Sequence, residues 1–120
     1  MIVQEFQSNI ITSGEISLMM IGGVYTHAVL KRAKQGDFRV QDDYGGSVVA
    51  YPPKADEIKF ANQILEALPF KPIYARVDIM IDNSGNLALS ELELIEPEMW
   101  FRLYPKAAKL LAQSIKKRFF

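Results

Sequence analysis

The chain has 120 residues, of which 49% are hydrophobic and 23% are charged, so it fits one ordinary domain and excludes a multidomain enzyme. Fourteen Lys and Arg residues balance fourteen Asp and Glu residues, and a net charge of zero provides no global field to neutralise a nucleic-acid backbone. The chain has no Cys and a single His, His27, which excludes disulfides, thiol catalysis, Cys-based zinc sites and His clusters.

A membrane or secretory role has no support in the sequence. The apolar stretch over residues 16–25 is interrupted by Ser17 and two glycines, and it is shorter than the ~20 residues that a membrane helix needs. The chain does not begin with a charged segment, an apolar run and a small-residue cleavage site. We therefore expect a cytoplasmic protein without a membrane or nucleic-acid partner, whose chemistry is left to carboxylates, Arg and Lys.

The first predicted elements are two strands over residues 15–21 and 24–32, where branched and apolar residues recur. Gly22 and Gly23 separate them and suit a two-residue hairpin loop, because glycine accepts positive φ without steric cost. Residues 33–50 then lose periodicity and contain three glycines. We therefore expect a long loop there, of the kind that is usually functional or disordered in a compact domain.

Two amphipathic helices are predicted further along the chain. The first begins at Asp56, after Pro52 and Pro53 have ended any preceding strand, and its spacing predicts about four turns. Its apolar positions are Ile58, Ala61, Ile64, Leu65 and Leu68. The second is expected near residues 104–119, where cations in the last turn oppose the helix dipole. Its apolar stripe consists of Leu103, Ala107, Leu110, Leu111 and Ile115.

Between these helices, residues 73–81 and 87–95 are predicted to form a second hairpin around a turn at residues 83–86, with Pro97 ending it. A turn of that length makes Asp82 the partner of Leu87. Two hairpins and two helices predict a single α+β domain over residues 1–120, in which an antiparallel sheet packs against the helices.

The second hairpin carries the sharpest functional signal. Counting back from its turn places Asp78 opposite Glu91 and Arg76 opposite Glu93, so three carboxylates and one guanidinium share a face. Directly opposed Cβ atoms lie ~5 Å apart, and like charges there destabilise the pair unless a cation lies between or beside them. Mg²⁺ or Mn²⁺ would serve, because both suit all-oxygen ligands. The alternative is that Arg76 neutralises the carboxylates in a surface ion network that contributes little.

A second signal is the run of basic residues beside glycines at residues 31–39. Arg suits bidentate phosphate contacts, and glycine lets a ligand approach the backbone closely. A basic loop is more often simply solvated, and the chain has neither a Walker nor a Rossmann glycine motif. His27 lies within a strand, and we interpret it as a satisfied or exposed imidazole rather than a general base.

At these residues the sequence resembles the C-terminal half of an ATP-grasp domain, in particular the branch of the ribosomal-protein glutamate ligases and bacterial glutathione synthetases. The resemblance covers nearly the whole chain. Residues 3–6 look like the hinge strand whose backbone meets adenine in that family, which implies nucleotide contacts at Glu5 and Phe6. Glu15 matches the acidic residue that the family places at the nucleotide.

The stretch from Lys31 to Gly46 is similar to the family's K-R … G-D-F-R-x-N … G-G segment. The resemblance therefore implies nucleotide contacts for Arg32, Arg39 and Gln41. Arg39 and Gln41 fall on the two positions that approach the ATP phosphates, and this gives Arg39 a catalytic role. Gln41 stands where the family more usually has Asn.

Residues 76–97 are similar to the family's R-x-D … E-x-N … P block, whose acidic and amide residues hold Mg²⁺. By position, Asp78, Glu91 and Glu93 become the metal ligands, although Glu93 stands where Asn is common and adds a negative charge. Arg76 becomes a catalytic residue that faces the acyl phosphate or its acceptor. The cofactors implied by the resemblance are ATP and Mg²⁺, or Mn²⁺ in its place.

The implied function is the ATP- and Mg-binding half of a ligase that phosphorylates a small-molecule carboxylate and lets an amine or thiol attack the acyl phosphate. The family's N-terminal ATP-grasp subdomain has no counterpart in these 120 residues, so we expect it as a partner and expect the chain alone to be inactive. A homodimer is expected through apolar residues of the first strands, which are Ile2, Val3, Phe6, Ile10 and Ile11. The alternative is a non-catalytic α+β interaction or oligomerisation domain that uses the first hairpin as an assembly edge.

Overall fold

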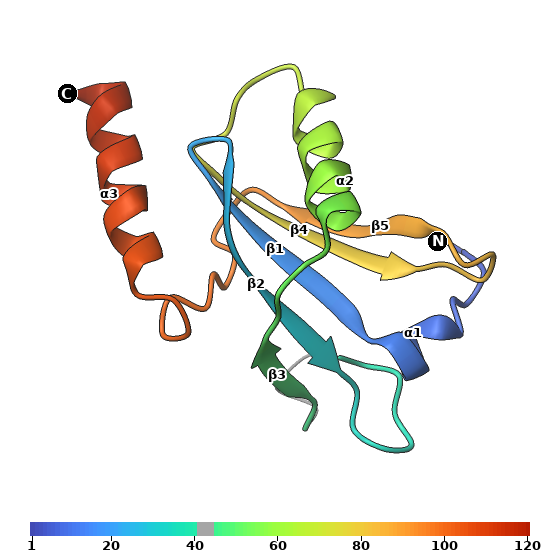
Figure 1. The fold of residues 1–120 in the computed structure, drawn as a ribbon. Coiled ribbons are helices and arrows are strands. Elements are labelled where there is room, and N and C mark those ends of the chain that lie inside the picture. Colours follow the sequence, from blue (N-terminus) through green and yellow to red (C-terminus); the bar gives the residue numbers. More distant parts are fainter. Residues whose placement is uncertain (41–44) are drawn as a thin grey trace.

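The computed structural model describes residues 1–40 and 45–120, and these residues form one five-stranded sheet and three helices (Figure 1). The strands are β1 (Glu15–Ile21), β2 (Val24–Arg32), β3 (Ser47–Ala50), β4 (Tyr74–Ile81) and β5 (Leu87–Glu93). The helices are α1 (Asn9–Ser13), α2 (Ala55–Glu66) and α3 (Lys106–Phe119). The sheet is antiparallel with the order β3-β2-β1-β4-β5, so the predicted α+β class and its antiparallel sheet are confirmed.

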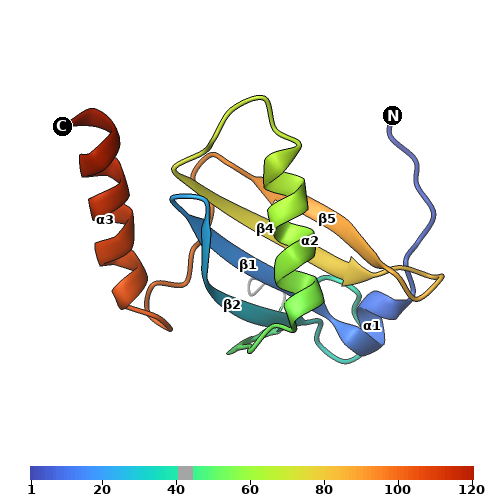
Figure 2. The ribbon, with the colours of Figure 1, turned by 45° about the horizontal axis from the view of Figure 1, so that its top comes forward.

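The two faces of the sheet are covered by different parts of the chain. Figure 2 shows α2 crossing one face, where Ala61 of α2 packs among apolar side chains of the central strands. These are Ile16, Leu18, Met20, Ala75, Val77 and Ile79. On the opposite face, Met99, Trp100 and Ala107 pack against a second apolar group from β1 and β2. β1 lies between these layers, which is why all seven of its residues are buried.

The first hairpin has the predicted strands and the predicted loop. Gly22 and Gly23 both adopt positive φ, at 61° and 79°, as a two-residue hairpin loop requires, and Ile21 pairs with Val24. A bulge at Thr26 then shifts the register by one residue.

The register of the second hairpin is right at the carboxylates and wrong at the turn. Asp78 faces Glu91 and Arg76 faces Glu93, as predicted. Asp82 does not pair with Leu87, however, because Leu87 faces Ile81. The Asp82 carboxylate instead accepts the backbone N–H groups of Ser84 and Asn86 at 2.9 Å, which draws Asp82 into the turn.

Ser90 compensates for this longer turn. It is the extra residue of a bulge in β5 between the partners of Ile79 and Asp78, so the strand regains the predicted register beyond it. The two departures from the predicted geometry therefore cancel before the chain reaches Glu91.

Several predicted elements need correction. Residues 3–6 form no strand, and residues 9–13 form α1, so the N-terminal residues do not provide the expected first strands. The expected loop over residues 33–50 contains β3, which pairs with β2. The first predicted helix ends at Glu66 after 12 residues, about three turns, so Leu68 lies beyond it. Its start is fixed by a capping contact, in which Glu57 accepts the backbone N–H of Lys54 at 2.7 Å.

Most of the first hairpin lies inside the sheet. β1 pairs with β2 and β4, whereas β3 pairs with β2 only over residues 29–32 and leaves the outer side of the rest of β2 without a partner strand in the described residues. The use of this hairpin as an assembly edge therefore stays a prediction. A homodimer stays a prediction, and of its expected apolar residues Ile10 is buried while Ile2, Val3, Phe6 and Ile11 are exposed. Within residues 1–40 and 45–120, no helix is long and apolar enough to cross a membrane.

Candidate functional site

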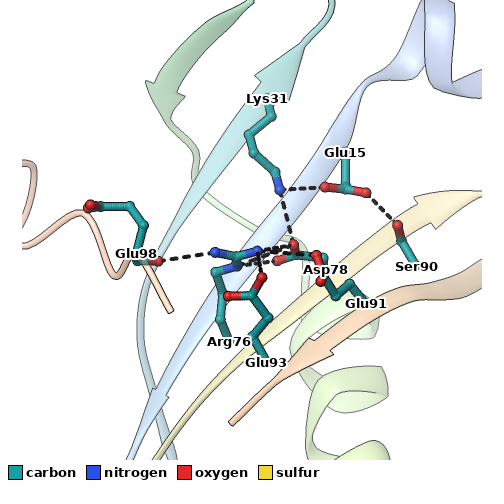
Figure 3. Close-up of polar contacts among 8 residues, drawn as sticks. All are labelled: Glu15, Lys31, Arg76, Asp78, Ser90, Glu91, Glu93 and Glu98. Carbon is teal, nitrogen blue, oxygen red and sulfur yellow. Dashed lines mark hydrogen bonds and ion pairs between the residues drawn. The ribbon is translucent and has the colours of Figure 1, made fainter. Parts of the chain in front are cut away.

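The centre of the site is the ion pair of Arg76 and Asp78, which project from β4 on the face opposite α2 (Figure 3). Asp78 is fully buried. Arg76 donates from Nε to Asp78 Oδ1 at 2.9 Å and from Nη2 to Oδ2 at 2.8 Å, a paired arrangement that fixes the guanidinium plane. Burial lowers the pKa of Arg76, but the hydrogen bonds and charge of Asp78 outweigh burial and leave this pKa raised. The Arg76 guanidinium is therefore charged at neutral pH.

A second buried cation reaches Asp78 from the other side. Lys31 of β2 places its Nζ 3.0 Å from Asp78 Oδ2 and also forms an ion pair with Glu15 of β1. Ser90 of β5 in turn donates its hydroxyl to Glu15. Figure 3 shows this chain of contacts running from Glu15 through Lys31 to Asp78. Four neighbouring strands thus contribute to one polar cluster within an otherwise apolar sheet.

Glu91 and Glu93 of β5 approach the same guanidinium from the exposed side. Arg76 Nη2 lies 3.4 Å from Glu91 Oε2 and 3.1 Å from Glu93 Oε1, and these side chains are 54% and 31% exposed. The pKa of Glu91 is raised by burial and by the charge and hydrogen bond of Glu93. Asp78, Glu91 and Glu93 thus all contact one guanidinium.

The three predicted metal ligands, Asp78, Glu91 and Glu93, are brought together, with Arg76 between them. In the described part of the chain, no three acidic or His side chains stand close enough to enclose a metal ion. The donor set consists of carboxylate oxygens, the ligands that a hard divalent cation prefers, although Arg76 and Lys31 hold both oxygens of Asp78 here.

The alternative of a surface ion network is correct that Arg76 pairs with the carboxylates. It is wrong that the centre of this network lies at the surface. Arg76 does neutralise the carboxylates, but Arg76, Lys31 and Asp78 are all buried, so their charges lie in a medium where unpaired ions are costly.

A cavity of about 320 Å³ adjoins this cluster and brings together four of the six predicted nucleotide contacts, which are Glu5, Phe6, Glu15 and Arg39. Ser90 also lines it, so Glu15 and Ser90 belong to both the cavity and the ion cluster. Phe6 and Phe38 stand edge to face across it with ring centroids 5.7 Å apart. The cavity therefore offers aromatic and charged walls beside the carboxylates.

The remaining predicted residues lie elsewhere or are less constrained. Arg32 is exposed and donates to the carbonyl oxygen of Thr12 at 2.7 Å, away from the cavity lining. Gln41 lies outside the described residues. Arg39 is 47% exposed and forms an ion pair with Asp37, in which Nη2 lies 2.6 Å from Oδ2, and its hydrogen bonds hold the pKa of Asp37 well below its usual range.

Two buried residues of the site escaped prediction. Lys31 neighbours Arg32, and a bulge-free hairpin would have put Leu30 rather than Lys31 opposite Glu15. Trp100 places its ring centroid 5.4 Å from Arg76 Cζ and 5.9 Å from Lys31 Nζ. His27, interpreted as a satisfied imidazole, does have hydrogen-bond partners, namely the Met99 carbonyl at 2.7 Å and the Thr26 hydroxyl at 2.8 Å.

Solved structures that share this fold are ATP-grasp ligases. D-cycloserine synthetase DcsG aligns with a TM-score of 0.81 at 26% sequence identity, over 96% of this chain and 41% of DcsG. The ATP-grasp ligase PsnB, solved with a phosphomimetic variant of its minimal precursor, Mg and ADP, gives 0.58 at 16% identity, over 83% of this chain and 33% of PsnB. D-alanine–D-alanine ligase from Bacillus anthracis, solved with ATP, gives 0.57 at 22% identity, over 86% of this chain and 36% of that ligase.

No protein-family model and no curated protein sequence matches the chain. The chain spans less than half the length of each of these three solved proteins. The described residues therefore have the fold of one part of an ATP-grasp ligase.

Proposed function

We propose that this chain supplies the nucleotide- and Mg²⁺-binding part of an ATP-dependent carboxylate–amine or carboxylate–thiol ligase, of the glutamate ligase and glutathione synthetase branch. The observation that carries the proposal is the position of Asp78, Glu91 and Glu93 around Arg76, directly beside the cavity that contains Phe6 and Arg39. Its support from relatives is the shared fold with DcsG, PsnB and D-alanine–D-alanine ligase, of which the latter two are solved with nucleotide.

Each part of the site has a distinct role in this proposal. Phe6 and Glu5 form the wall against the base, and Arg39, with Gln41, contacts the phosphates. Asp78, Glu91 and Glu93 would hold Mg²⁺, which supplies charge neutralisation to the phosphate oxygens when bound. Arg76 offsets the charge that develops on the transferred phosphoryl group. No protein nucleophile is needed, because the amine or thiol itself attacks the acyl phosphate.

The experiment that tests the proposal is calorimetric titration of the chain with Mg–ADP, together with the thermal midpoint at saturating ligand. Glu91→Gln combined with Glu93→Gln removes two ligands at an exposed and a half-buried position. The variant is therefore expected to fold and to bind at least about tenfold more weakly, a loss of about 1.4 kcal/mol. Glu66→Gln, at the end of α2, is the matched control and leaves the affinity unchanged.

Two results would contradict the proposal. One is a wild-type chain whose thermal midpoint does not respond to Mg–ADP, since a ligand that does not bind the native state cannot stabilise it. The other is unchanged affinity in the double variant. The first result would favour the alternative of a non-catalytic interaction domain.

We further infer that the chain by itself binds nucleotide without turning it over, because it spans 41% of DcsG and the proposed reaction uses a cleft between subdomains. The measurement is release of ADP from Mg–ATP in the presence of amine and carboxylate mixtures. Amine-dependent ADP formation by the isolated chain would overturn this inference while leaving nucleotide binding in place.

A further inference from the structure

Trp100 covers both of the cations that hold Asp78. Its side chain is in the buried interior, with 5% of the residue exposed, and its ring centroid lies 5.4 Å from the guanidinium carbon of Arg76 and 5.9 Å from the ammonium of Lys31. Both distances are within the range at which an aromatic face attracts a cation. Among aromatic side chains, the indole of Trp provides the strongest such attraction.

The backbone around Trp100 is held in an uncommon conformation by contacts with the same cluster. Trp100 has φ 45°, a left-handed value that is strained for a bulky residue. Its N–H donates to the carboxylate of Glu98 at 2.7 Å, and the preceding carbonyl, of Met99, lies 2.7 Å from His27 Nε2. Arg76 itself donates to the Glu98 carbonyl oxygen at 3.5 Å. Such strain persists only where the surroundings determine it, and here the surroundings include Arg76.

The ring face, rather than the indole N–H, makes the contacts that matter. Within the described residues the buried Nε1 of Trp100 has no hydrogen-bond partner. The ring packs in the apolar group that contains Met19 and Val29. The largest aliphatic side chains are smaller than an indole and would offer no aromatic face to the cations. The ring of Trp100 therefore both fills this space and faces Arg76 and Lys31.

We propose that Trp100 is a positioning residue, whose ring face holds the Arg76 guanidinium in the orientation in which it contacts Asp78, Glu91 and Glu93. The role rests on the proposed function, because that guanidinium is the group that offsets charge on the transferred phosphoryl group. Trp100 acts through Arg76 and does not itself contact the nucleotide.

The contact is tested without any ligand. Trp100 is the single Trp of the chain, so its emission reports on this position alone. Arg76→Lys keeps the charge and removes the planar group, and it is expected to shift the Trp100 emission in the folded chain. A control substitution on the opposite face, Ile58→Val in α2, leaves the emission unchanged. Unchanged emission in Arg76→Lys would overturn the proposal.

The positioning role is tested by Mg–ADP affinity in a double-mutant cycle. Trp100→Leu is expected to weaken binding about tenfold in the wild-type background and less than about twofold in Arg76→Lys, because the ring acts through that guanidinium. Trp100→Phe keeps an aromatic face and is expected to retain affinity within about threefold. Circular dichroism and thermal midpoints establish that each variant is folded.

The outcomes separate this inference from the proposed function. Absence of Mg–ADP binding by the wild-type chain contradicts the proposed function, and the positioning role fails with it. Wild-type binding that Trp100→Leu leaves intact contradicts the role of Trp100 alone. Equal losses on Trp100→Leu in both backgrounds show that the ring acts independently of Arg76, which also contradicts it.

Discussion

The two sides of strand β4 are built in opposite ways, one from apolar and one from charged side chains. Toward α2, Val77 and Ile79 are fully buried among apolar side chains, and burial of such surface stabilises the fold by about 25 cal/mol per Å². On the other face of the same strand, Arg76 and Asp78 are equally hidden but charged. Removing ions from water costs free energy that their mutual attraction only partly offsets. The apolar side of β4 therefore stabilises the fold, whereas its ionic side is explained by the site that it forms.

The largest expected loss of unfolding free energy comes from a substitution at Asp78, the centre of the ionic side of β4. Asp78→Asn keeps the shape of the side chain and removes its charge, which leaves Arg76 and Lys31 buried without their shared partner. The expected loss is about 3–5 kcal/mol of unfolding free energy, the usual consequence of breaking a buried ion pair by removing one partner. Urea unfolding followed by circular dichroism measures it.

Ile79→Ala, one residue further along β4, is the control on the apolar face and costs about 2–5 kcal/mol through the cavity that it leaves. The two variants are therefore expected to lose similar amounts of unfolding free energy. They differ in Mg–ADP affinity at temperatures where both variants are folded, since only Asp78→Asn loses it. Loss of affinity in both variants would show that the faces are not separable in function.

A smaller effect on stability is expected at Glu91, on the exposed side of the site. The pKa of Glu91 is raised in the folded chain, so the folded state holds the proton more tightly than the unfolded state. The contribution of Glu91 to stability is therefore greatest below the ordinary pKa of a Glu and falls as pH rises through the raised value. Glu91→Gln removes this dependence, and the variant is expected to exceed the wild type in thermal midpoint at pH 7 but not at pH 4.

Thermal midpoints of both proteins between pH 4 and pH 7 measure the effect. Glu96→Gln, outside β5, serves as the control and leaves the wild-type profile unchanged. A Glu91→Gln variant that is less stable than the wild type at pH 7 would show that its attraction to Arg76 outweighs its repulsion by Glu93.

Local patterns in the sequence were sufficient to predict β4 and β5, the two strands that carry the carboxylates. Alternation of apolar and charged residues and a turn-forming tetrad placed Asp78 opposite Glu91 and Arg76 opposite Glu93, although the turn was assigned one residue too short. The placement survived because Ser90 supplies an extra residue on the other strand. A bulge has no sequence signature that alternation can detect, so this agreement depended on two compensating departures.

Bulges, backbone conformation and short strands explain why Lys31, Trp100 and β3 were not predicted. The bulge at Thr26 moves Lys31 opposite Glu15, so Lys31, which was not among the predicted site residues, enters the cluster. Trp100 reaches Arg76 through a left-handed backbone that is uncommon for a bulky residue and that no alternation of apolar and polar residues predicts. Strand β3 has only four residues within a glycine-rich stretch, too few for alternation to be recognised.

The form of β5 also bears on aggregation. β5 and β3 are the outermost strands, and a flat apolar strand in either position would offer its free backbone groups to a second molecule. β5 is kinked by its additional residue at Ser90 and carries two acidic side chains, while β3 is very short. Each of these features discourages unwanted strand addition. The carboxylates can thus remain open to a ligand at the margin of the sheet without turning that margin into a template for fibre growth.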